Sequence, residues 1–213
     1  MNTVSIDSDP LPPHEVKDGA WQPRPIAVPL TLKKIHNPGG LMNGAGVYLL
    51  PMTNQWCAFD FASKDWVEPN GMGRVADVEF LVEWDGKPPV GSRLCKLKMR
   101  FPGRGAGGYF APTVTESELP YQYEANGNNP FKTEEITVVN RDGDPHFTKV
   151  NFREDAELIV RCRCLFNDDE LVAANYGSIR GLKVSPSWNS NPTIRFAYVF
   201  NPKANDTNLE LQR

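Results

Sequence analysis

The three histidines are the first side chains to test for catalysis. His14, His36 and His146 are far apart in the sequence, and no nucleophile elbow or similar local motif accompanies any of them. Only the fold could bring a nucleophile, a histidine and an acid together. The sequence therefore favours a protein that is not an enzyme.

The four cysteines could in principle bind metal or form disulfides. They lie inside apolar, strand-like runs, at Cys57, Cys95, Cys162 and Cys164. No CxxC pair or cysteine–histidine cluster joins them, so a zinc site is not expected. Cys162 and Cys164 are two residues apart and would share one face of a strand. We expect free, buried thiols in a reducing compartment.

Two kinds of loop carry residue types that bind ligands in other proteins. Residues 103–108 (GRGAGG) match GxGxxG after a strand, but residues 109–112 (YFAP) cannot begin the helix that a dinucleotide site needs. We interpret this stretch as a flexible loop that could order at an interface. Residues 142–144 (DGD) and 168–170 (DDE) could supply oxygen ligands for calcium, but neither matches a complete calcium loop. We therefore expect no cofactor and no metal.

Aromatic side chains in or beside predicted loops are the remaining candidates for binding. On the rim of a β-sandwich they can stack on sugars or anchor a partner protein. Alternatively, they fold back and cap the open ends of the sandwich. The candidates for interface or ligand contact are Tyr109, Phe110, Tyr121, Tyr123 and Trp188. The three tyrosines would be the ones to stack on a sugar.

The elements that must position these residues are predicted to be strands, most clearly in residues 73–101. The apolar residues that alternate in the two halves of this stretch are Val78, Phe80, Val82 and Trp84, then Cys95, Leu97, Met99 and Phe101. The residues between them, on the wet faces, are Asp77, Glu79 and Glu83, then Lys96, Lys98 and Arg100. Alternation with a period of two residues gives each strand one buried face and one solvent-exposed face. If the strands pair, opposite charges face each other across the ladder.

Other runs complete the predicted set of elements. Strands are expected at 26–32, 136–139, 158–166, 179–184 and 193–201, strands or packed loop segments at 47–50 and 56–61, and a short helix over 171–175. In residues 158–166, Leu158, Val160, Cys162, Cys164 and Phe166 would share one face. The fold class is therefore all-β: a two-sheet β-sandwich, either jelly roll or immunoglobulin-like.

The chain divides into three parts by composition. Residues 1–25 are rich in proline and predict an extended N-terminal arm, residues 26–202 form the sandwich domain, and residues 203–213 form a polar, mobile tail. The net charge of −3 gives no electrostatic reason to bind nucleic acid or an anionic membrane. The sequence contains no 18-residue apolar run that predicts a membrane span, and its N-terminus does not resemble a secretory signal.

Two stretches resemble the capsid proteins of picornavirus-like, positive-strand RNA viruses. Residues 74–102 are similar to the paired central strands of that family, and residues 177–201 (GSIRGLKVSPSWNSNPTIRFAYVFN) to its last two strands. The resemblance implies an eight-stranded jelly roll with long loops and an extended N-terminal arm. It also implies a virion location, with assembly in the host cytoplasm.

The function expected from the sequence is a capsid protein. Its partners would be copies of itself or other capsid subunits, in an icosahedral shell that encloses RNA without a basic arm. A host receptor or a glycan is a further candidate partner. The alternative is a carbohydrate- or ligand-binding β-sandwich that uses the rim aromatics.

Overall fold

The structure is a computed structural model. It describes residues 16–17, 20–21, 40–83, 94–113, 124–133, 135–141, 148–150, 156–185 and 190–211. These residues form strands, turns and bends, and none is helical. The chain divides into two units, residues 1–34 and residues 35–213. In the first unit, β1 (Val16–Lys17) pairs with β2 (Ala20–Trp21).

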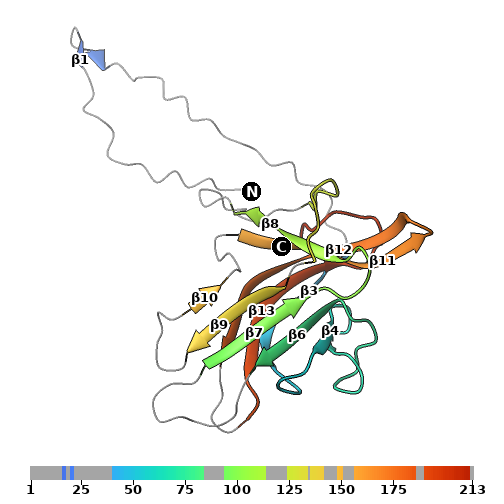
Figure 1. Cartoon of the computed structure of the whole chain (residues 1–213). Helices are drawn as coiled ribbons and strands as arrows, with labels where there is room; N and C mark the ends of the chain where they lie inside the picture. The colour runs from blue at the N-terminus through green and yellow to red at the C-terminus, as the bar shows by residue number, and fades with distance from the viewer. Residues whose placement is uncertain are drawn as a thin grey trace. The chain divides into compact units, whose positions relative to one another are not determined.

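Two antiparallel sheets form the second unit (Figure 1). The six-stranded sheet has the order β10-β9-β7-β6-β4-β5, and its strands are β4 (Cys57–Asp60), β5 (Asp65–Trp66), β6 (Val78–Glu83), β7 (Leu94–Arg100), β9 (Ile136–Arg141) and β10 (Thr148–Val150). The five-stranded sheet has the order β3-β13-β12-β11-β8, and its strands are β3 (Met42–Leu49), β8 (Gly107–Pro112), β11 (Ala156–Asn167), β12 (Glu170–Ser185) and β13 (Thr193–Asn201).

The all-β, two-sheet prediction is confirmed, but the eight-stranded count is too low and the jelly-roll order is not confirmed. A jelly roll combines two Greek keys. Here β11, β12 and β13 follow one another in the chain and lie side by side in one sheet, with β3 next to β13 (Figure 1). The hairpins between consecutive strands keep these neighbours in the same sheet.

The core lies between the sheets and follows the predicted alternation. The inward side chains of β6, β7 and β13 are buried: Val78, Phe80, Val82, Cys95, Leu97, Met99, Ile194, Phe196, Tyr198 and Phe200. The two short runs expected to be strands or loop segments give β4 and the end of β3.

The predicted charge ladder between β6 and β7 is also present. Glu79 lies opposite Arg100 and Glu83 opposite Lys96 in the register of the two strands. Arg100 Nε is 2.6 Å from Glu79 Oε2, and Lys98 Nζ is 2.6 Å from Glu83 Oε1. Such half-exposed pairs contribute roughly 0–1 kcal/mol each, so they support register more than stability. Asp77 was assigned to the same wet face, and that prediction is wrong because Asp77 is fully buried.

Three other sequence predictions need correction or fall outside the described residues. Residues 171–175 form part of β12 rather than a helix. The segment expected to be a mobile tail is held in place over residues 203–211, since Asn201 Nδ2 donates to the carbonyls of Asp206 and Asn208 and Leu209 is buried. The predicted strand at 26–32 lies outside the described residues.

Candidate functional site

The aromatic candidates that the structure describes are Tyr109 and Phe110, and β8 places them on opposite faces of its sheet. Phe110 packs against the main core. The Tyr109 ring lies on the outer face, with its centroid 5.1 Å from that of Phe131, and its hydroxyl accepts a hydrogen bond from the Asn126 N–H at 2.8 Å. Tyr121, Tyr123 and Trp188 lie outside the described residues.

Tyr109 belongs to a small second core on the outer face of the five-stranded sheet. Phe131 packs between Tyr109 and Tyr176, and the Arg161 guanidinium lies 4.4 Å from the centre of the Phe131 ring. Buried Leu209, from the C-terminal segment, belongs to the same cluster. Tyr109 therefore packs into this second core on the outer face of the sheet, and not across an open end of the sandwich.

The glycine-rich loop is held by the hairpin between β11 and β12. Gly103 and Gly105 have φ of +95° and +76°, and β8 begins at Gly107, so a strand follows where a dinucleotide site needs a helix. The Arg104 guanidinium donates to the Asp168 carbonyl at 2.9 Å and to Asp169 Oδ1 at 2.5 Å. The loop thus contacts the fold itself.

Neither a metal-binding cluster nor a membrane-spanning helix occurs in the described residues. No group of three His, Cys, Asp or Glu side chains in the described ranges could hold a metal ion. Residues 142–144 and all three histidines lie outside those ranges. The described chain also contains no helix long and apolar enough to cross a membrane.

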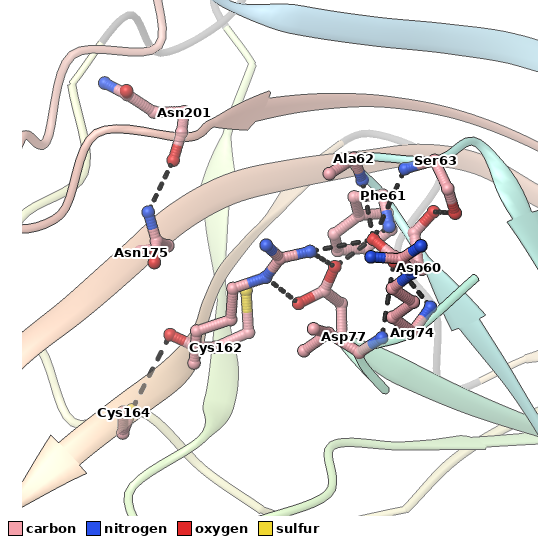
Figure 2. A network of polar contacts seen from close by, with 12 residues as sticks. Asp60, Phe61, Ala62, Ser63, Arg74, Asp77, Cys162, Cys164, Asn175 and Asn201 are labelled. Atoms are coloured by element: carbon pink, nitrogen blue, oxygen red, sulfur yellow. Dashed lines mark hydrogen bonds and ion pairs between the residues drawn. The ribbon is translucent and has the colours of Figure 1, made fainter. Parts of the chain in front are cut away.

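A buried network of Asp60, Asp77 and Arg163 is the most developed polar site, and the sequence analysis missed it. Arg163 Nε donates to Asp77 Oδ1 at 2.8 Å. Its Nη2 donates to Asp77 Oδ2 and to Asp60 Oδ1, both at 2.8 Å (Figure 2). Asp77 is fully buried and Asp60 almost so. Asp60 ends β4 and Asp77 precedes β6, whereas Arg163 comes from β11, so the network joins the two sheets.

Backbone groups complete the network. Asp60 Oδ1 accepts from the Ala62 N–H at 2.9 Å, and its Oδ2 accepts from the Arg74 N–H at 3.0 Å. Asp77 Oδ2 accepts from the Phe61 N–H at 2.9 Å. All four carboxylate oxygens therefore accept hydrogen bonds from the protein itself. This arrangement fits a structural tie between the sheets better than a site for substrate.

A β-bulge lets Arg163 turn inward. Arg163 has φ of +51°, and the register of β11 against β12 shifts between Cys162 and Leu165. Its guanidinium lies 4.8 Å from the centre of the Phe200 ring, inside the sandwich. Cys162 stays in the main core, whereas Cys164 packs against the second core. The prediction that these two cysteines share a face is therefore wrong.

The cysteines are free and mostly buried. Cys57, Cys95 and Cys162 are buried, and Cys164 is partly exposed. Burial raises the pKa of the Cys95 thiol to about 12, and burial also raises the pKa of the Cys162 thiol well above its ordinary value. These thiols stay protonated at neutral pH, so they are poor nucleophiles.

The network should make stability depend on acid pH through Asp60. Burial alone would raise the pKa of Asp60, but hydrogen bonds from backbone N–H groups, including those of Arg74 and Ala62, bring it below its ordinary value of 3.8. A carboxyl whose pKa is lower in the folded state stabilises the fold above its unfolded pKa and loses this effect as pH falls through its folded pKa. Urea unfolding from pH 6 to pH 3 should show this loss.

The Asp60→Asn variant isolates this contribution, because Glu83 and Asp206 also have lowered pKa values. We expect the variant to be less stable at pH 6 and to lose less stability than the parent between pH 4 and pH 3. Equal losses in the two proteins over that interval would contradict the role assigned to Asp60.

Comparison with protein-family models, curated proteins and solved structures found no match to this chain.

Proposed function

We propose that this chain is a non-enzymatic structural subunit of a viral shell. The observation that carries the proposal is the placement of large exposed apolar side chains. In the described residues these fall in three pairs, each within one strand, loop or hairpin: Val47 and Leu49, Met72 and Val75, Leu165 and Val172. Single exposed apolar residues need no explanation, but grouped ones mark surfaces that contact other molecules.

The polar geometry supports the same proposal. The buried charges of the network contact one another and the backbone, and Tyr109 is packed into the second core. A rigid sandwich that exposes apolar side chains is suited to assembly, in which many weak contacts per subunit add up to a closed shell.

The viral part of the proposal rests on the resemblance of residues 74–102 and 177–201 to picornavirus-like capsid proteins. In this view copies of the chain, alone or with other capsid subunits, enclose RNA, and the virion is assembled in the host cytoplasm. The net charge of −3 fits a shell that encloses RNA without a basic arm. A host receptor or a glycan is a further candidate partner in this proposal.

The carbohydrate-binding alternative has lost one of its three stacking candidates. A sugar needs an open aromatic face, and Tyr109 packs against Phe131. Tyr121 and Tyr123, which lie outside the described residues, are the candidates left to that alternative.

Removal of residues 1–25 tests the proposal through the arm. We expect the shortened protein to remain folded, with a melting temperature within a few degrees of the full chain, and to lose assembly. The physical reason is that an arm ordered only on assembly adds contacts between subunits and little to the core. Circular dichroism and sedimentation velocity measure the two effects. An unfolded product, or unchanged assembly, would contradict this role of the arm.

A further inference from the structure

A basic and apolar surface lies at one edge of the five-stranded sheet. Lys183, Arg195 and Val47 are register partners across β12, β13 and β3. Ser185, Thr193 and Leu49 form the adjacent row on the same outer face. We call these six residues the basic patch: Val47, Leu49, Lys183, Ser185, Thr193 and Arg195.

The basic patch is electrostatically unfavourable by itself. Lys183 and Arg195 are exposed and directly opposite each other, and like charges in that position destabilise a sheet. Neither has a carboxylate partner among the described residues. Val47 is 64% and Leu49 54% exposed beside them. A ligand that is both anionic and apolar would relieve the repulsion and cover the apolar side chains.

The β11–β12 hairpin carries the complementary surface at its end. Leu165 is 63% and Val172 48% exposed, and they flank the exposed acidic residues of the turn. We call this group the acidic tip: Leu165, Asp168, Asp169, Glu170 and Val172. Arg104 pairs with Asp169, which leaves the other two carboxylates without a cation partner among the described residues.

The basic patch and the acidic tip cannot meet within one molecule. Val172 and Lys183 lie on the same strand, β12, and are eleven residues apart. At the usual rise of a strand this separation is about 35 Å. The hairpin end of β11 and β12 points away from the sandwich (Figure 1). Contact between the two surfaces therefore requires two copies of the chain.

We propose that copies of this chain associate head to tail, with the acidic tip of one copy docked on the basic patch of the next. This inference rests on the proposed function and names the contact through which assembly occurs. The interface uses two different surfaces, so it is heterologous and generates a ring when the rotation between copies closes and an open filament when it does not; a closed shell needs further contacts between such units. An open row of copies keeps one free patch at one end and one free tip at the other until it closes, so it can add further copies.

Charge reversal on each side separately tests the inference. The first variant, Lys183→Glu with Arg195→Glu, makes the patch acidic. The second, Asp168→Asn with Glu170→Lys, changes the summed charge of the tip and its partner Arg104 from −2 to +1; asparagine is chosen because residue 168 has φ of +53°, which Asn tolerates. The matched control is Lys64→Glu with Lys132→Glu, two exposed lysines with no described ion pair.

Sedimentation velocity of the full-length proteins gives the readout. We expect each interface variant alone to sediment as a monomer, while the control assembles like the parent. An equimolar mixture of the two variants should assemble again, because each acidic tip then meets a basic patch and each basic tip an acidic one. Assembly of the parent should also weaken when salt is raised from 50 mM to 500 mM, because salt screens the attraction between the acidic tip and the basic patch.

The outcomes separate this inference from the proposed function. If the parent assembles and both interface variants assemble equally well, the head-to-tail contact is wrong and the structural role stands. If the variants fall apart but their mixture does not reassemble, the pairing of tip with patch is wrong. If the parent never associates, the head-to-tail contact is wrong, and so is assembly from copies of this chain alone.

Discussion

Replacing Arg163 with methionine is expected to lower the free energy of unfolding by about 3–5 kcal/mol, because removing one partner of a buried ion pair leaves the other charge uncompensated. Two carboxylates, Asp60 and Asp77, would lose their shared cation. Methionine retains much of the side-chain volume, so loss of packing contributes little. Urea denaturation at pH 7 measures the change.

Two further variants show that the effect belongs to the network. Arg195→Met removes an exposed arginine and should change stability by less than about 0.5 kcal/mol. In an Asp77→Asn background, Arg163→Met should cost less than in the parent, since one of the two buried negative charges is already gone. Equal costs in the two backgrounds would contradict a coupling between Arg163 and Asp77.

Replacing Phe59 with alanine is expected to cost a similar amount, about 3–5 kcal/mol, through the cavity left in the core. Phe59 is fully buried on β4, and its ring centroid lies 5.4 Å from both Trp66 of its own sheet and Phe196 of the opposite sheet. The Tyr48 ring is 4.9 Å away. Phe59 therefore packs the two sheets against each other.

The matched control is Phe59→Leu, which retains most of the buried volume and should cost clearly less than the alanine variant. Near-ultraviolet circular dichroism should lose intensity in Phe59→Ala, because neighbouring aromatic rings lose their fixed packing. If Phe59→Ala is as stable as Phe59→Leu, the central packing role assigned to Phe59 is wrong.

Much of the fold follows from period-two alternation. Phe80, Leu97 and Phe196 are buried where the sequence predicts. The facing charges on β6 and β7 follow from the same pattern. These predictions succeed because a strand with one buried face requires apolar and polar residues to alternate, and this alternation is visible in the local sequence.

The errors arise where nonlocal contacts decide the structure. Residues 167–170 look like a helix cap, but Asp168 instead adopts a left-handed turn conformation between two long strands. Arg163 looks like an outward residue of a regular strand, and only the bulge turns it inward. The jelly-roll order, which the structure does not confirm, depends on which strands pair, and alternation carries no information about pairing.

The candidate site was harder to predict than the fold. Asp60, Asp77 and Arg163 each interrupt or border an apolar run, and this is the one local signal that marks them. Arg163 is 103 positions from Asp60 and 86 from Asp77 in the sequence. A single sequence does not reveal that residues so far apart are in contact. Tyr109 is aromatic and near a predicted loop, which marks it as a binding candidate, but its ring packs into the second core.

The central claim is assembly, and the size of the purified full-length protein tests it most directly. Analytical ultracentrifugation, with negative-stain microscopy of any fast fraction, should reveal closed particles tens of nanometres across beside a pool of the 23.8 kDa chain. A single monomeric species across the concentration range, at low salt and neutral pH, would contradict self-assembly of this chain.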